Sequence, residues 1–316
     1  MTEPSNQEPG WERRLLEKLA SDSIVEQRRR RRWGIFFKLL GLVYLTVVLL
    51  KLAGFDFSLE HDVVSKHTAL VDLRGVIADH GEASAESIMS SLQNAFQDKN
   101  TQGVVLRINS PGGSPVQSGM INDEIYRLRK LYPSIPLYAV VEDICASGGY
   151  YVAVAADQIF VNKASILGSI GVLMDGFGFT GSMEKLGVER RLLTAGSNKG
   201  FLDPFSPQDA HQKEHAQLLL NDVHQQFIQV VRKGRGERLK ETPDLFSGLM
   251  WTGQRSLELG LADAYGSVES VARDVVKAGD IVDFTQKQNL AERVAKKLGA
   301  DMANQLEHFL LQSRLR

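Results

Sequence analysis

Ser147 is the residue of this sequence best suited to covalent chemistry. It follows an apolar segment at 136–141, typical of a buried parallel strand, and precedes Tyr151–Ala156, typical of a buried helix. Its hydroxyl is therefore expected near a helix N-terminus, where unpaired N–H groups and the helix dipole stabilise the anion that forms when serine attacks a carbonyl. A serine that merely caps the helix is the alternative interpretation of this stretch.

A serine nucleophile needs a base within hydrogen-bond reach. Among the histidines, only His80 comes near a predicted strand end; the others fall in a linker, a polar helix or the C-terminal tail. Lys199 lies in a short Gly/Ser/Asn loop, ahead of apolar residues that would exclude water and depress its pKa. Lys163 and Lys185 are rivals in weaker surroundings, and a solvated surface charge is the alternative interpretation of Lys199.

Two glycine-rich turns supply the backbone donors that an oxyanion requires. The N–H of Gly148 directly follows Ser147, and the turn Pro111–Ser114 comes at the end of a neighbouring predicted strand. The lone cysteine, Cys145, is a second candidate nucleophile, although its small apolar neighbours favour a packed thiol.

Composition excludes several classes of protein. The 316 residues carry a formal net charge of −1, which gives no general attraction to nucleic acid, and one cysteine excludes an intrachain disulfide framework. With 43% hydrophobic residues the chain is long and apolar enough for one large or two modest globular domains.

The N-terminal region predicts a membrane anchor. Five arginines at 28–32 precede an apolar segment at 33–55, which has the length needed to cross a bilayer as a helix. The arginines predict that the N-terminus stays in the cytoplasm and that the rest of the chain is outside. A cleaved signal peptide and a buried core helix are the alternatives, but no convincing cleavage site follows the apolar segment.

The region after the anchor alternates strands and helices at the spacing of a parallel sheet with crossover helices. The predicted strands are 68–77, 103–109, 135–141 and 158–161, and the predicted helices between them are 84–98, 116–131 and the segment after Ser147. Beyond them we predict an extended stretch at 165–172, a helix at 181–186, a strand at Val188–Leu193, helices at about 206–233, 253–260 and 268–278, and an amphipathic tail helix at 290–311.

Four motifs in this order resemble the signal peptide peptidase A family of bacterial serine peptidases: RINSPGG at 107–113, ASGGYY at 146–151, GSIGV at 168–172, and Lys199 followed by Pro204-Phe205. The resemblance covers about residues 68–280 and implies a Clp-protease-like, crotonase-type α/β fold. It implies Ser147 as nucleophile and Lys199 as general base, with Gly113 as the second oxyanion donor and Ser169 orienting the lysine. The family often has Ser-Gly-x-x-Lys around the lysine, whereas this chain has Ala195-Gly196-Ser197-Asn198-Lys199.

The expected organisation has five parts: a cytoplasmic segment at 1–32, the transmembrane anchor at 33–55, a linker at 56–67, the serine peptidase domain at 68–285 and the helical tail at 286–316. The expected activity is cleavage of remnant signal peptides at the bacterial inner membrane, on its periplasmic side, without a cofactor or nucleic acid. The resemblance also implies a ring of identical subunits in which one protomer supplies both serine and lysine. An acyl-CoA hydratase or isomerase of the same fold and an inactive membrane scaffold are the alternative functions.

Overall fold

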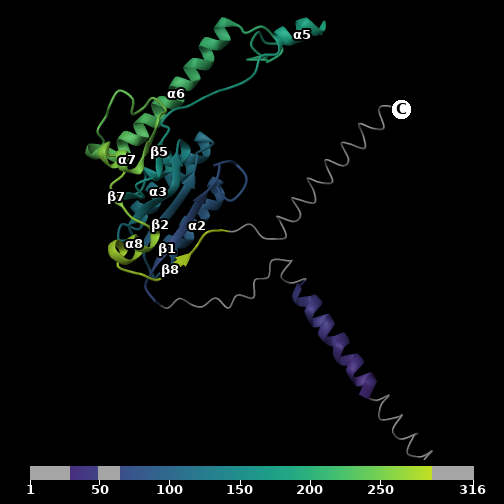
Figure 1. Cartoon of the computed structure of the whole chain (residues 1–316), viewed down its shortest axis with the longest axis vertical. Helices are drawn as coiled ribbons and strands as arrows, with labels where there is room; N and C mark the ends of the chain where they lie inside the picture. The colour runs from purple at the N-terminus through teal and green to yellow at the C-terminus, as the bar shows by residue number, and fades with distance from the viewer. Residues whose placement is uncertain (1–28, 49–64, 287–316) are drawn as a thin grey trace, which may run out of the picture. The chain divides into compact units, whose positions relative to one another are not determined.

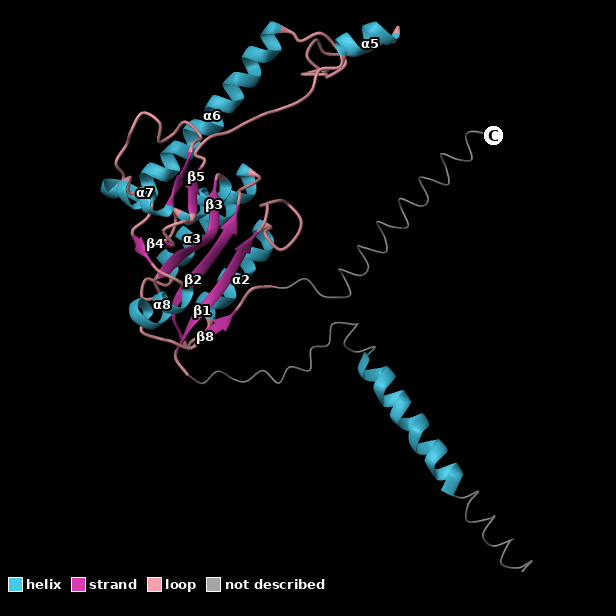
Figure 2. Ribbon diagram, viewed as in Figure 1, coloured by secondary structure: helices cyan, strands magenta, loops and turns pink. Residues whose placement is uncertain are grey.

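The computed structural model describes residues 29–48 and 65–286, and its main unit is a mixed α/β domain (Figure 1). The described residues form an eight-stranded sheet in which six strands run in the order β6-β5-β3-β2-β1-β8 (Figure 2). Strand β4 also pairs with β3, and β7 pairs with β4. All strand pairs are parallel except β5 with β6. The predicted α/β class with a mostly parallel sheet is therefore confirmed.

Three neighbouring strands form the centre of the sheet: β1 (His67–Arg74), β2 (Thr101–Ser110) and β3 (Leu137–Ala146). Successive side chains of a strand point to opposite faces, and the core divides accordingly. Leu106 of β2 lies in the large cluster that includes helix residues, whereas Val105 lies in a smaller cluster with Val268 and Val271 on the other face. Both faces are thus covered, as parallel sheets require.

Helices α2 (Ala85–Gln97) and α3 (Pro115–Leu131) follow β1 and β2 and agree with the predicted helices. Each begins at a serine whose hydroxyl accepts a hydrogen bond from a backbone N–H of the first turn: Ser84 from Ser87, and Ser114 from Gln117. These caps define where the crossover helices begin.

Strand β3 is longer than predicted and uses two neighbours on one side. Its first half pairs with β4 (Gln158–Val161), and its second half pairs with β5 (Ile166–Gly168). Extension to Ala146 joins the strand through one residue, Ser147, to α4 (Gly148–Ala153). The apolar run alone ended the prediction at 141, because the last residues of β3 include charged side chains.

The predicted strand at Val188–Leu193 is wrong: these residues have no regular structure and their side chains are exposed. They belong to a segment that we call the arm, residues 171–209, which includes α5 (Thr180–Leu186). A strand needs a neighbour to satisfy its backbone groups, and no strand of the described part of the chain pairs with this one.

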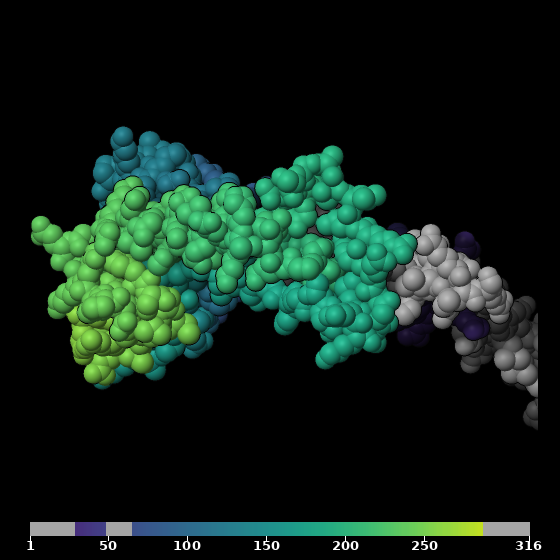
Figure 3. Space-filling view, turned by 90° about the horizontal axis from the view of Figure 1, so that it is seen from above, coloured from purple at the N-terminus to yellow at the C-terminus, as the bar shows by residue number. Residues whose placement is uncertain are grey.

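The arm leads into α6 (Ala210–Arg235), the longest helix of the domain. The predicted start at Ser206 is wrong, because Asp209 is the N-cap and accepts a hydrogen bond from the N–H of Gln212. Figure 1 shows the arm at the end of α6 that lies away from the sheet. In the space-filling view the arm stands out as a lobe that joins the domain along α6 (Figure 3).

The C-terminal part of the domain completes the sheet. It contains a short 3₁₀ turn, η1 (Gly236–Arg238), then β6 (Met250–Thr252), α7 (Gly253–Glu258), β7 (Ala264–Tyr265), α8 (Val268–Ser270), the π-helical turn η2 (Val271–Val276) and β8 (Ile281–Asp283). The predicted helix at 253–260 is confirmed as α7. The predicted helix at 268–278 is a short α-helical turn followed by a π-helical one, and β6, β7 and β8 were not predicted.

Residues 29–48 form a helix that belongs to a separate unit of the chain. Within the described ranges, no helix combines the length and the apolar character that a membrane crossing requires. The predicted anchor extends to residue 55, so its last seven residues lie outside the described ranges, as do most of the cytoplasmic segment at 1–32, most of the linker and the tail at 290–311.

An ion pair between Arg235 and Asp263 stabilises the end of α6. Arg235 is 1% exposed, and its two terminal nitrogens donate to the two carboxylate oxygens of Asp263 at 2.8 Å. Burial opposes ionisation of Asp263, but the hydrogen bonds and charge of Arg235 outweigh it, so its pKa lies below the ordinary value.

Replacing Asp263 with Asn is expected to destabilise the domain strongly. The change leaves a buried guanidinium without its counter-ion, which costs about 3–5 kcal/mol of unfolding free energy near pH 7. Because the pKa of Asp263 is lowered in the folded state, its contribution is complete above an unfolded-state pKa of about 4 and is lost as pH falls through the folded-state pKa. Urea unfolding of both proteins at pH 7 and toward pH 2 tests this, and a cost that does not shrink in acid would contradict it.

Candidate active site

Ser147 occupies a strained turn between β3 and α4. Its backbone has φ 50° and ψ −121°, a conformation that is costly for a residue with a Cβ. Its N–H donates to the carbonyl of Gly168 at 2.8 Å, and its carbonyl accepts from Tyr151 at 2.9 Å, so the turn is held on both sides. A strained strand-to-helix turn of this kind presents a serine hydroxyl at the edge of a sheet.

The hydroxyl of Ser147 is not used for capping. Ser147 is the N-cap residue of α4, yet its side chain accepts no hydrogen bond from the first turn. By contrast, the side chains of Ser84, Ser114 and Asp209 all cap their helices. The alternative interpretation of Ser147 as a simple cap is therefore wrong, and its half-buried hydroxyl is available for chemistry.

The predicted glycine turn lies directly against Ser147. A Cβ on Gly112 would stand 2.7 Å from the Cβ of Ser147 and 2.6 Å from the nitrogen of Gly148, so only glycine fits. Gly113 has φ 151°, and a Cβ there would stand 2.1 Å from the carbonyl oxygen of Ile77. The backbone therefore approaches the serine as closely as an oxyanion donor must.

The N–H groups of Gly113 and Gly148 are the candidate oxyanion donors of this turn. Gly148 begins α4, so its N–H has no acceptor within the helix. The bridge between Ile77 and Gly113 uses the N–H groups of Ile77 and Ser114, at 2.8 Å each, and does not use that of Gly113. The nitrogen of Gly113 lies 3.2 Å from the position that a Cβ of Gly148 would take.

Two serines that sequence reasoning missed support these glycines. The hydroxyl of Ser110 accepts from the N–H of Gly112 at 3.1 Å and donates to the carbonyl of Gly75 at 2.6 Å. Ser118 of α3 is fully buried, and its hydroxyl would lie 2.4 Å from a Cβ at Gly148. Ser110 belongs to the RINSPGG motif and was recognisable there, whereas nothing in the sequence indicates Ser118.

Ser169 lies beside Ser147 because β3 and β5 run parallel in register. Ala146 pairs with Gly168, so the residues that follow them leave the sheet at the same edge. Both serines have φ 50°, and the N–H of Ser169 donates to the carbonyl of Leu249 at 2.8 Å. The structure thus brings Ser147, Gly113, Gly148 and Ser169 together, and the orienting role of Ser169 stays a prediction.

Lys199 is carried by a segment that lies away from this group within one chain. It lies on the arm, between α5 and α6, and its side chain is exposed. Figure 1 shows this part of the arm at the distant end of α6, away from the carboxyl end of β3. The expectation that a single protomer supplies both serine and lysine therefore gains no support from this chain, and the role of Lys199 as base remains a prediction.

The surroundings of the other candidates differ from those of Ser147. Cys145 is completely buried, and burial raises the pKa of its thiol far above the ordinary value, which supports a packed thiol. His80 is exposed and pairs with the adjacent Asp79 at 3.4 Å. Lys163 lies over the ring of Tyr265 at 5.9 Å, and Lys185 is exposed on the arm.

Comparison with known proteins supports the family that the four motifs indicated. The model of peptidase family S49 matches residues 129–281, which include Ser147 and Lys199. A putative signal peptide peptidase SppA of Enterococcus faecium is 30% identical over 236 residues, covering 72% of this chain and 68% of that protein. Protease 4 of Haemophilus influenzae is 31% identical over 237 residues, covering 74% and 37%.

A further relative shows how far the similarity reaches. A Brucella abortus protein named Na(+)/H(+) antiporter NhaA is 43% identical over 215 residues, but the chain spans 29% of its length. That protein is much longer than this chain, and its name refers to the whole protein. The relative from Enterococcus faecium, of which more than two thirds is covered, shows that this chain belongs to peptidase family S49, the signal peptide peptidase A family of serine peptidases.

Proposed function

We propose that this chain is a serine endopeptidase in which Ser147 attacks the scissile carbonyl. The observation that carries the proposal is the uncapped, strained Ser147 beside the N–H groups of Gly113 and Gly148. In the tetrahedral intermediate the carbonyl oxygen becomes an anion, which these two N–H groups would stabilise. The serine proton passes to a neutral lysine, and the resulting ammonium then protonates the leaving amine.

We propose Lys199 of a neighbouring copy of this chain as that base. The arm carries Lys199 away from its own Ser147, and most of its large apolar side chains are exposed, including Leu173, Phe177 and Leu193. Many exposed apolar side chains in one segment are typical of a surface that contacts another protein. Docking of the arm on a second copy would bury these residues and remove water from the lysine. Closed homo-oligomers repeat one such contact around a ring.

Exposed apolar side chains near the glycine turn support an apolar peptide as the substrate. Val116 and Met120 follow the glycine turn in sequence and are 69% and 45% exposed; Val76, which is 64% exposed, precedes Ile77, the residue that bridges to Gly113. An apolar peptide would cover them, and signal peptides left in the bilayer after precursor cleavage are such peptides. Together with the apolar segment at 33–55 and the arginines before it, this supports a single-pass inner-membrane enzyme with its peptidase domain on the periplasmic side.

Labelling with a fluorophosphonate tests the nucleophile. In detergent we expect the probe to modify wild-type protein at Ser147, to leave Ser147→Ala unmodified and to label Lys199→Ala at least tenfold more slowly, because the alcohol lacks its base. A charged probe that cannot cross membranes, added to intact spheroplasts, tests the side of the membrane. Equal labelling of Ser147→Ala would refute the nucleophile, and equal labelling of Lys199→Ala would refute the base.

A further inference from the structure

Helix α6 connects the domain to the arm that carries Lys199, and it is buried mainly near its C-terminal end. Phe227, Ile228, Val231 and Arg235 are buried, whereas Ala216 is the one buried residue that we find between 210 and 226 in this described helix. The first two thirds of α6 therefore project from the domain, and the direction of the arm depends on how the last third is held.

The last third of α6 packs on α4, the helix that begins at the nucleophile. The rings of Phe227 and Tyr151 lie 5.2 Å apart. Two turns later, α6 approaches the C-terminal end of α4 so closely that a Cβ on Gly234 would stand 2.1 Å from the carbonyl oxygen of Val154. That neighbour is backbone, which cannot rotate away as a side chain can. Gly234 thus determines how close α6 lies to α4.

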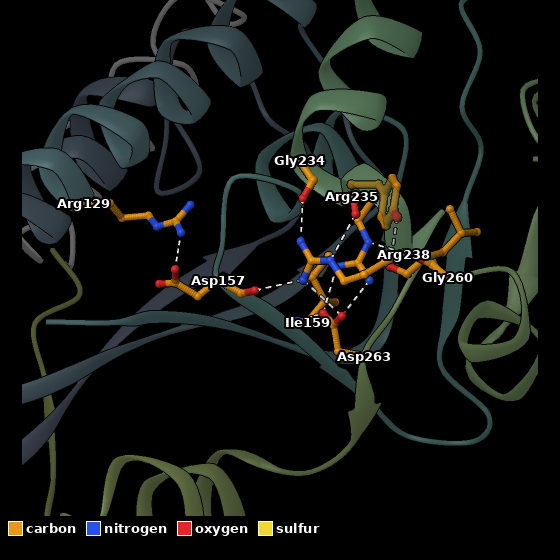
Figure 4. Close-up of polar contacts among 10 residues, drawn as sticks. Arg129, Asp157, Ile159, Gly234, Arg235, Arg238, Gly260 and Asp263 are labelled. Carbon is orange, nitrogen blue, oxygen red and sulfur yellow. Dashed lines mark hydrogen bonds and ion pairs between the residues drawn. The ribbon is translucent and has the colours of Figure 1, made fainter. Parts of the chain in front are cut away.

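The next residue, Arg235, anchors the same turn to the sheet (Figure 4). Besides its two bonds to Asp263, it donates through Nε to the carbonyl of Gly260 at 2.8 Å. Asp263 in turn accepts from the N–H of Ile159 in β4 at 2.7 Å. Arg238 donates to the carbonyl of Gly234 at 2.7 Å and to Asp263 at 3.1 Å, which also holds the end of the helix.

We propose that Gly234 and Arg235 are positioning residues that set the direction of α6 and thereby place Lys199. The inference rests on the proposed role of Lys199. From Gly234 to Ala210 the helix is about 36 Å long, so a tilt of about 5° at the anchor moves the arm by about 3 Å. A general base must come within about 2.6–3.2 Å of the proton that it takes, so this displacement would separate the lysine from the serine.

Gly234→Ala, placed in one partner at a time, tests the proposal. A chain with Lys199→Ala supplies only the serine, and a chain with Ser147→Ala supplies only the lysine. In a co-expressed mixture, a site is therefore active only where a Lys199→Ala chain contacts the arm of a Ser147→Ala chain. Gly234→Ala in the lysine-supplying chain is expected to lower kcat of the mixture about 100-fold, because misplacement by an ångström or more has effects of this size. In the serine-supplying chain, Gly234→Ala moves an arm that already lacks its lysine. We therefore expect kcat of that mixture to stay within about twofold of the mixture without Gly234→Ala.

Controls separate positioning from general damage. Gln229→Ala, at an exposed position one turn earlier, is expected to change neither mixture. Arg235→Lys keeps the charge but loses the paired bonds to Asp263, so it repeats the one-sided effect if Gly234→Ala fails to fold. An equal fall of kcat with Gly234→Ala in either chain would overturn the proposal.

A distance measurement separates this proposal from the proposed function. Spin labels at Lys130→Cys in α3 and Lys213→Cys in α6 report the tilt without any activity, with the buried Cys145 left in place. We expect the distance between labels to shift by several ångströms in Gly234→Ala and to stay constant in Gln229→Ala. An unchanged distance would overturn the positioning role, whereas a shift in a chain whose mixtures are inactive would uphold it and refute the proposal that Lys199 comes from a neighbouring copy.

Discussion

Co-expression of the Ser147→Ala and Lys199→Ala chains is expected to restore peptide hydrolysis, although each variant alone is inactive. In the proposed arrangement, the arm that carries Lys199 docks on a second copy, so each working site takes its serine from one copy and its lysine from the next. Random assembly of equal amounts places the required chain at each of two positions half of the time, which predicts about a quarter of wild-type activity.

The measurement is hydrolysis of a fluorogenic apolar peptide in detergent, with each variant purified alone as the baseline. A mixture of Ser147→Ala with the double variant Ser147→Ala/Lys199→Ala is the matched control, because it forms oligomers without any intact serine. No recovery in the mixture of single variants, with oligomers formed normally, would contradict the shared site.

Gly113→Ala is expected to lower kcat by about 10²–10³ while Ser147 remains in place, because this is the usual effect of losing one oxyanion donor. The added Cβ would stand 2.1 Å from the carbonyl oxygen of Ile77, and φ 151° is strained for alanine. The turn must therefore move, and the N–H of Gly113 moves with it. KM is expected to change much less than kcat, because the donor acts on the charge of the transition state.

Gly119→Ala is the matched control for this substitution. It adds the same methyl group to α3, but nothing lies within 4 Å of the Cβ position. We expect unchanged kcat and slightly higher stability, since alanine favours a helix by about 1 kcal/mol over glycine. Steady-state kinetics and thermal unfolding of both variants make the comparison, and a kcat for Gly113→Ala within tenfold of wild type would contradict its role as donor.

The sequence predicted the elements that depend on residues close together in the chain. The helix at Ala85–Gln97 was predicted because Ser84 and the apolar spacing of Ile88, Leu92 and Phe96 act within a few residues. The strand predicted at Val188–Leu193 does not form, because strand formation needs a partner that a local pattern cannot reveal. The same limit concealed β6 and β8, which are only three residues long.

The site divides in the same way. From the sequence alone, Ser147 and its glycines were recognisable, because a strand, a small uncrowded turn and a helix follow one another within a few residues. Tertiary structure decided that Ser169 joins them, through pairing of β5 with β3, and that the arm, the segment with Lys199, lies at the far end of α6. In our proposal the position of Lys199 depends on the direction of a 26-residue helix, whose C-terminal end contacts residues distant in the chain through Gly234 and Arg235. Such long-range packing leaves no periodic or local signal in a single sequence.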